Sequence, residues 1–146
     1  LPMLGLRTAN SPMTAGKTDR PAAGYILRYV YLFEEEVRRG RDEGVKERFV
    51  VVVGVEGSRY LVAAITTKGE GRKNAIVIPD EIARTAGLAP GSAIVISEFN
   101  RFTWPGFDIR PLMKQPGYIA GRLPPRFTAK IIDAIAAWGA APVDRD

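Results

Sequence analysis

The chain has 146 residues, 46% of them apolar and 25% charged, so it is long enough for one domain with its own core and too short for two comfortable ones. It contains no cysteine and no histidine, which excludes disulfides, zinc-thiolate sites and thiol nucleophiles and removes the commonest general base. Twenty-one Lys and Arg against sixteen Asp and Glu give a formal charge of +5, which favours a polyanionic partner, although an ordinary basic surface has the same composition.

Residues 1–23 mix Pro, Gly, Ser, Thr and Ala without periodicity, which is typical of a flexible leader. Because the chain starts at Leu1, Met13 is a candidate natural start and residues 1–12 are candidates for a non-native addition. The longest apolar runs, such as "FVVVVGV", are strand-sized and far shorter than the roughly 18 to 20 residues of a membrane span. No signal-peptide pattern is present, so we expect a cytoplasmic protein that has no membrane partner.

After the leader, the first half of the chain predicts three strands. "YILRYVYLF", residues 25–33, is rich in β-branched and aromatic residues, as strands are. The run "EEEVRRGRDEGVKER" that follows is charged and contains two glycines, as in a solvated loop. "RFVVVVGVEGSRYLVAAITT" predicts a hairpin, with strands at 49–55 and 60–66 joined by the turn "EGSR".

The second half predicts shorter strands separated by a short helix. Strands are expected at "AIVIP", after the loop "KGEGRKN", then at "SAIVISEF", and finally at "YIAGRL". Between the first two, "PDEIARTAGLAPGS" has the start and stop signals of a helix, with Asp80 as N-cap and Gly87 as C-terminal stop.

The chain closes with an amphipathic pattern in "LPPRFTAKIIDAIAAWGAA". Its spacing predicts a helix that stops at Gly139 and carries four apolar residues on one face: Phe127, Ile131, Ile135 and Trp138. Because short strands dominate and no alternating βαβ rhythm appears, we expect a mainly β fold, a small twisted barrel or half-barrel in residues 24–139, followed by a tail at 140–146.

Polar residues at the ends of apolar strands are the first candidates for chemistry. Arg48 opens "RFVVVV", Thr66 and Thr67 end "LVAAITT", and Glu98 with Arg101 lies at the end of "SAIVISEF". If the strands at 49–55 and 60–66 form an antiparallel hairpin, Arg48 and Thr66 lie at the same open end. A guanidinium binds phosphate through two hydrogen bonds, and a threonine hydroxyl can donate to a phosphoryl oxygen.

Each of these residues also has a purely structural interpretation. An arginine before a strand is usually a surface charge, and a threonine at a strand end usually makes a turn hydrogen bond.

The order of four motifs, over about residues 24–138, resembles the PemK/MazF toxins: "GVKERFVVVV", "AAITTKGEG", "SEFNRF…FDI" and a C-terminal amphipathic helix after "LPP". The resemblance implies a small SH3-like barrel of the PemK/MazF (CcdB-like) type, with a short internal helix and a C-terminal helix. It also implies a homodimeric toxin of a toxin-antitoxin system, a growth inhibitor that cuts single-stranded RNA as an endoribonuclease.

Carried over residue by residue, the family's catalytic arginine falls on Arg48, its catalytic threonine on Thr66, its acidic residue on Glu98 and the following arginine on Arg101. The chain departs from the family pattern at two places. Phe49 stands where the family usually has proline, and "FTWPGF" is inserted before Asp108. Some members also use a histidine, which this chain lacks.

The implied reaction is transesterification, in which the ribose 2′-hydroxyl attacks the adjacent phosphorus and leaves a cyclic phosphate and a free 5′-hydroxyl. It requires no metal or other cofactor. Arg48 would hold the phosphorane charge, Thr66 would donate to a nonbridging oxygen, and Glu98 is the candidate base.

RNA binding is assigned to residues around this centre. A base could stack on Trp104, Phe102 or Phe107, and a loop with Lys68, Arg72 and Lys73 could follow the backbone. The full set of candidate RNA-binding residues is Thr67, Lys68, Arg72, Lys73, Arg101, Trp104 and Asp108. The aromatic Pro-Gly segment has a second interpretation, a folded plug that caps the barrel.

Two other functions stay open. A toxin-like barrel could bind RNA or protein without cutting, because fold alone does not guarantee activity. The stretch "NAIVIPDEIARTAGLAPGSAIVI", residues 74–96, also resembles the AbrB-type swapped-hairpin domain, which binds DNA. If the PemK/MazF resemblance holds, the expected protein partner is a small acidic antitoxin.

Overall fold

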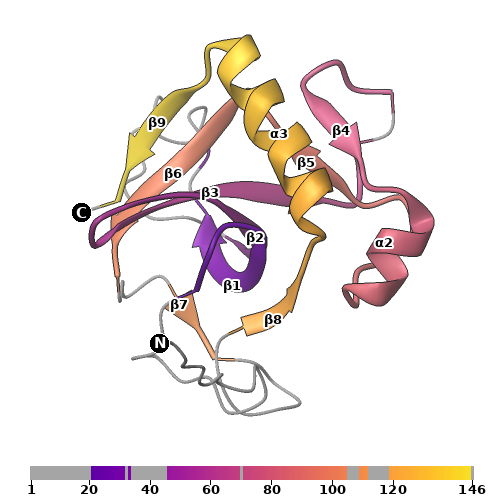
Figure 1. The fold of residues 1–146 in the computed structure, drawn as a ribbon, viewed down its shortest axis with the longest axis horizontal. Coiled ribbons are helices and arrows are strands. Elements are labelled where there is room, and N and C mark those ends of the chain that lie inside the picture. Colours follow the sequence, from indigo (N-terminus) through magenta and orange to yellow (C-terminus); the bar gives the residue numbers. More distant parts are fainter. Residues whose placement is uncertain are drawn as a thin grey trace, which may run out of the picture.

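The computed structural model describes residues 21–31, 33, 46–69, 71–104, 109–111 and 119–145. Within these ranges the chain forms nine strands and two helices, so the fold is mainly β, as predicted (Figure 1). The strands are β1 (Tyr25–Tyr31), β2 (Lys46–Glu56), β3 (Arg59–Thr66), β4 (Ala75–Val77), β5 (Ala93–Val95), β6 (Glu98–Thr103), β7 (Ile109–Arg110), β8 (Ile119–Arg122) and β9 (Ala141–Asp144). The helices are α2 (Asp80–Thr85) and α3 (Pro125–Trp138).

Strands β1, β2 and β3 form the centre of the sheet, each antiparallel to the next. The predicted hairpin is confirmed: β2 and β3 are joined by the "EGSR" turn, in which Gly57 has a φ of 65° that favours glycine. The register pairs Val50 with Ala64 next to the open end of this hairpin.

The outer edge of β3 is shared by two strands that follow each other in the chain. Its first part pairs with β6 and its last two residues pair with β5. Ser97 lies between β5 and β6, where its hydroxyl accepts a hydrogen bond of 3.1 Å from the Asn74 side chain. The segment expected as one strand, "SAIVISEF", is therefore divided into two strands that bend around the edge of β3.

The other edge of the sheet is shared in the same way, because β1 pairs with both β7 and β8. Residues 141–144, which the sequence analysis assigns to a tail, form β9 and pair in parallel with β6. The pairings among the described residues do not close the sheet into a ring, so this part of the chain forms an open sheet and not the closed form of the expected barrel.

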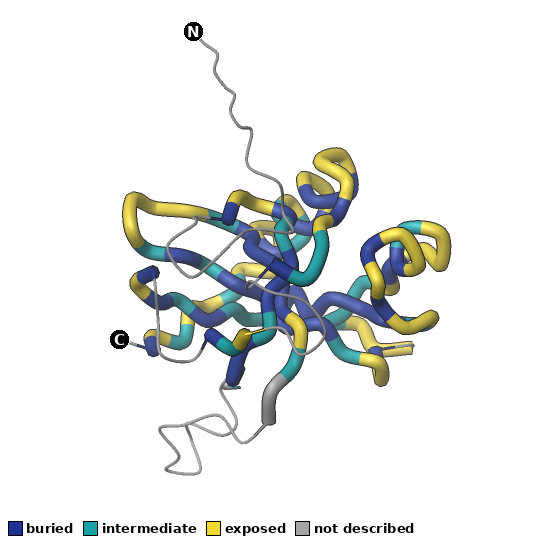
Figure 2. Tube along the Cα trace, turned by 90° about the horizontal axis from the view of Figure 1, so that it is seen from below, coloured by how far each residue is buried: buried dark blue, intermediate teal, exposed yellow. Residues whose placement is uncertain are grey.

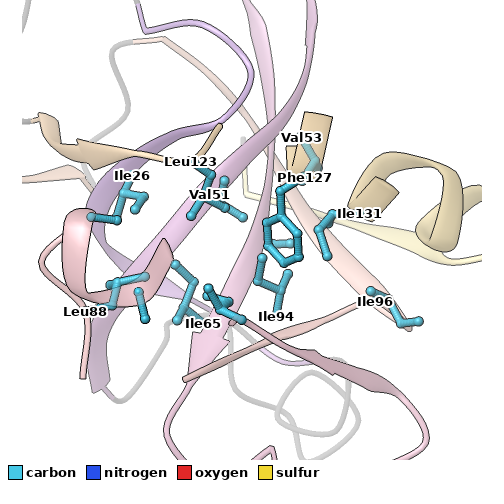
Figure 3. Packing of buried hydrophobic residues seen from close by; sticks show 14 of the residues in the cluster. Ile26, Val51, Val53, Ile65, Leu88, Ile94, Ile96, Leu123, Phe127 and Ile131 are labelled. Carbon is cyan, nitrogen blue, oxygen red and sulfur yellow. The ribbon is translucent and has the colours of Figure 1, made fainter. Parts of the chain in front are cut away.

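Both faces of the central strands are buried, which explains the unbroken apolar run in β2. Val51 and Val53 point into one cluster, while Val50 and Val52 point into another on the opposite face. Figure 3 shows the first cluster, where residues of the sheet meet Phe127 and Ile131 of α3. Figure 2 distinguishes the deeply buried central strands from the exposed outer turns of the helices.

The two helices follow the predicted pattern with two differences. Asp80 is the first residue of α2 and Pro79 takes the N-cap position without a side-chain hydrogen bond, whereas Gly87 has the expected left-handed φ of 78° after the helix. In α3, Phe127, Ile131 and Ile135 are buried, but Trp138 in the last turn is 48% exposed. Helical periodicity gives the direction of a side chain, but it does not indicate how far the covering sheet extends.

The AbrB-like stretch, residues 74–96, contains β4, α2 and β5. Strand β5 pairs with β4 on one side and with β3 on the other, so this stretch is part of the common sheet. Within the described ranges, no helix is long and apolar enough to cross a membrane.

Candidate functional site

A pocket of about 530 Å³ lies at the open end of the β2–β3 hairpin and the start of the loop after β3. We call it the cationic pocket, because four of its lining residues are Arg28, Arg48, Lys68 and Arg72. Of the described residues that line it, none is acidic. The other lining residues are Phe33, Phe49, Ile65, Thr66, Thr67 and Val95.

Arg48 and Thr66 both line this pocket, as antiparallel pairing predicts. The last pair of the β2–β3 register at this end is Val50 with Ala64, and Arg48 and Thr66 each lie two residues beyond it, toward the pocket. The Arg48 guanidinium also lies over the Phe33 ring, 4.7 Å from its centroid, which directs the charged group toward the pocket.

Thr66 makes the turn hydrogen bond that its position at a strand end suggests. Its Oγ1 accepts a 3.1 Å bond from the Lys68 backbone N–H. Because the hydroxyl oxygen accepts this bond, its hydrogen can still be donated to a ligand. The structural and the functional interpretation of Thr66 are therefore compatible, since the turn orients the hydroxyl.

The loop after β3 is held close to the sheet by Gly69. This glycine is buried, and a Cβ on it would collide with Ala93 of β5. Its carbonyl accepts a 3.1 Å hydrogen bond from the Arg72 N–H, and Gly71 between them has a φ of 78°. This tight turn places Lys68 and Arg72 at the pocket, while Lys73 is exposed and does not line it.

Glu98 begins β6 and is not among the described lining residues. It acts on the buried Tyr31 of β1: burial and then the negative charge of Glu98 raise the pKa of the Tyr31 hydroxyl, whereas Arg48 lowers it. Glu98 and Arg48 therefore both lie close enough to influence Tyr31, although Glu98 lies outside the pocket wall.

Arg101 also lies away from the cationic pocket, contrary to expectation. Its β3 partner is Leu61, five residues before Thr66, which corresponds to about 17 Å of strand. Its guanidinium donates two hydrogen bonds to Asp144 of β9, at 2.6 and 2.8 Å. These bonds, with added charge from Arg59, lower the pKa of Asp144. Arg101 therefore attaches β9 to β6. The sequence near Arg101 does not predict this contact.

Trp104 and Phe102 are buried, with exposures of 7% and 1%. Both pack with Tyr60, whose ring centroid lies 5.4 Å from that of Trp104, and Phe102 also packs on Tyr29. We call these four residues the aromatic cluster. The burial of Trp104 disfavours its assignment as a base-stacking residue, because only 7% of it is exposed, and favours the interpretation as a structural plug. Asp108 and Phe107 lie outside the described residues.

Three aromatic or charged lining residues were missed by sequence reasoning: Arg28, Phe33 and Phe49. Arg28 in β1 donates a 2.9 Å hydrogen bond to the Pro111 carbonyl and is the cross-strand partner of Phe49. The available signal was a single charged residue inside the apolar strand "YILRYVYLF".

Among the described residues, no three acidic side chains are grouped so that they could hold a metal ion. Neither a family model nor a curated protein matches this sequence.

Proposed function

We propose that this chain is a PemK/MazF-like toxin with an SH3-like barrel, a metal-independent endoribonuclease that cuts single-stranded RNA. One observation carries the proposal: Arg48 and Thr66, at the open end of one hairpin, line the same pocket, and its other charged lining residues, in the described part of the chain, are all cationic. The motif order described above supports the assignment to this family.

The proposed reaction forms a bond between the 2′-oxygen and phosphorus and breaks the bond between phosphorus and the 5′-oxygen. The 2′-hydroxyl gives its proton to water, the leaving 5′-oxygen takes a proton from water, and the products are a cyclic 2′,3′-phosphate and a 5′-hydroxyl. Negative charge accumulates on the nonbridging oxygens in the transition state. A guanidinium and a hydroxyl donor aimed at these oxygens stabilise that state more than the ground state.

Arg48 supplies the positive charge in this proposal and Thr66 supplies the neutral donor. The turn bond from Lys68 orients the Thr66 hydroxyl, so it requires little reorganisation when the charge develops. Thr67, Lys68, Arg72 and the exposed Lys73 would bind the flanking phosphates.

Glu98 has no contact with the RNA in this proposal, because it does not line the pocket. It is close enough to influence Tyr31, as Arg48 also is. We therefore assign Glu98 an electrostatic role near Tyr31, and water accepts the 2′ proton.

The partners follow from the same resemblance and from the charge of the pocket. We propose a homodimer inhibited by an acidic antitoxin, whose carboxylates would compete with RNA phosphates for the same arginines and lysines.

The test is incubation of the protein with a long single-stranded RNA in EDTA, followed by mapping of the fragment ends. The wild type should cut at discrete sites and leave cyclic phosphate ends. Arg48→Ala should cut about 10² to 10³ times more slowly, as when one donor to a developing oxyanion is removed. The matched control is Arg101→Ala, which removes an arginine of β6 that lies outside the pocket and should cut at nearly the wild-type rate.

Two results would contradict the proposal. Equal cutting by the wild type and Arg48→Ala would place the activity elsewhere. RNA that stays intact but bound would instead support the alternative of a non-catalytic RNA-binding barrel.

A further inference from the structure

Phe49 is an aromatic residue exposed at a charged site. It is 37% exposed and lines the cationic pocket, and it stands where the PemK/MazF pattern usually has proline. The described large apolar side chains that are similarly exposed are Val55, Val77 and Trp138. None of these three lines the cationic pocket.

Phe49 lies beside residues that could contact a nucleotide. Its cross-strand partner on β1 is Arg28, and the next residue along β2 is Arg48. Because side chains alternate along a strand, Phe49 and Arg48 leave β2 on opposite faces, and both line the pocket. Arg48 and Thr66 share the sheet face of Val50 and Ala64, and Phe49 shares the opposite face with its partner Arg28.

Unpaired RNA bases bind to proteins mainly by stacking on aromatic rings, while arginines hold the phosphates on either side. Trp104 cannot provide this ring because it is buried in the aromatic cluster. Phe49 has the exposed area, and the two arginines beside it supply the charges for adjacent phosphates.

We infer that Phe49 stacks an unpaired RNA base beside the phosphate held by Arg48, and that Arg28 contacts the neighbouring phosphate. This inference rests on the proposed function, because it names the residues that bind the substrate of that same pocket. It makes Phe49 a determinant of substrate binding at a position where the family's proline has no aromatic ring to stack.

The test measures the affinity of two oligonucleotides that cannot be cut. One is a single-stranded 2′-O-methyl RNA, which lacks the attacking hydroxyl, and the other has the same backbone without bases. Phe49→Leu should bind the first about tenfold or more weakly than the wild type does, because one stacking contact is lost, and should bind the abasic chain equally well. Phe49→Trp keeps a ring and should retain the affinity for both.

Two further variants separate the contributions. Trp138→Leu removes an exposed aromatic residue outside the pocket and should change neither affinity. Arg28→Gln should weaken binding of both oligonucleotides and reduce the salt dependence of binding by about one phosphate contact.

Equal affinity of the wild type and Phe49→Leu for the base-containing oligonucleotide would overturn the inference, and so would equal losses on both oligonucleotides. If Phe49→Leu does not fold, a tenfold loss in Phe49→Trp would also overturn it. In each case, Arg48-dependent cutting of ordinary RNA by the wild type would leave the proposed function standing. A wild type that neither binds nor cuts RNA would overturn both.

Discussion

The cationic pocket and the aromatic cluster both contain phenylalanine and both lie near arginines, but they differ in accessibility. Each combines phenylalanine with other apolar side chains, and each has arginines nearby. In the aromatic cluster the rings are buried, and the adjacent Arg101 is bound to Asp144. In the cationic pocket Phe49 is exposed, and the described lining residues include four cations and no carboxylate.

This difference indicates that composition alone does not distinguish a binding surface from a structural plug. The stretch "SEFNRFTWPGFDIRP" has the more conspicuous mixture of aromatic and charged residues, yet its described aromatic residues Phe102 and Trp104 are buried. The accessible ring and the excess of positive charge therefore favour the pocket as the ligand site.

The largest expected effect separates the two regions by stability. Trp104→Ala should lower the free energy of unfolding by about 3–5 kcal/mol, because it leaves a cavity beside Tyr60 and Phe102. Phe49→Ala should lower it by less than Trp104→Ala does, because 37% of Phe49 is already exposed. Urea denaturation with linear extrapolation measures both. Similar losses in the two variants would contradict the contrast between a plug and an open site.

The next prediction concerns the loop that supplies two of the pocket's cations. Gly69→Ala places a methyl group against Ala93, so the loop must move away from β5. We expect a stability loss of about 1–3 kcal/mol and cleavage about tenfold or more slower, because displaced cations no longer fit the phosphates.

The control for this variant is Gly57→Ala in the hairpin turn. Its φ of 65° makes alanine strained, but the turn is not part of the pocket, so stability should fall while cleavage per folded molecule stays unchanged. Unchanged cleavage by Gly69→Ala would show that the loop position does not matter for activity.

A smaller effect is expected for Glu98→Gln, which removes a charge but keeps the shape. Glu98 does not line the pocket. The cleavage rate of Glu98→Gln should therefore fall by less than about tenfold, a smaller loss than that of Arg48→Ala. Single-turnover rates of both variants on one RNA provide the comparison. A loss as large as that of Arg48→Ala would instead make Glu98 the proton acceptor suggested by the family resemblance.

The smallest effect concerns the ion pair near the aromatic cluster. The pKa of Asp144 is lower in the folded protein than in the unfolded chain, so its ion pair stabilises the fold above the unfolded pKa, and this stabilisation is lost as the pH falls through the folded value. Asp144→Asn should therefore melt slightly below the wild type at neutral pH, and the difference should vanish in acid. Asp133→Asn, at an exposed position on α3, is the control. A difference that persists in acid would mean that the charge of Asp144 is not its cause.

Much of the strand and helix pattern was predictable because it depends on neighbouring residues. The apolar run of β2, the "EGSR" turn and β3 predict a hairpin, and a hairpin alone brings Arg48 and Thr66 to the same end. The division at Ser97 and the pairing of β9 with β6 were not predicted, because both depend on which distant strand edge is available.

The candidate site divides in the same way. Lys68 and Arg72, which the sequence places in one basic loop, line the pocket because the glycines around them make a local turn. Arg28 and Phe49 were not predicted, because they meet through pairing of strands separated by a long connection. Arg101 was predicted to bind RNA. Its true partner, Asp144, lies 43 residues further along the chain, so no local pattern could reveal the pair.

By itself, the sequence determined that the fold is mainly β, where its principal strands and helices lie, and that Arg48 and Thr66 share one end of a hairpin. Hydrophobic period, turn residues and antiparallel register are sufficient for these conclusions. Only the tertiary structure decided that Trp104 is buried while Phe49 is exposed, and that Arg101 is paired while the pocket collects positive charge. Burial and ion pairing are properties of long-range contacts, and identical residue types acquire different roles according to what packs against them.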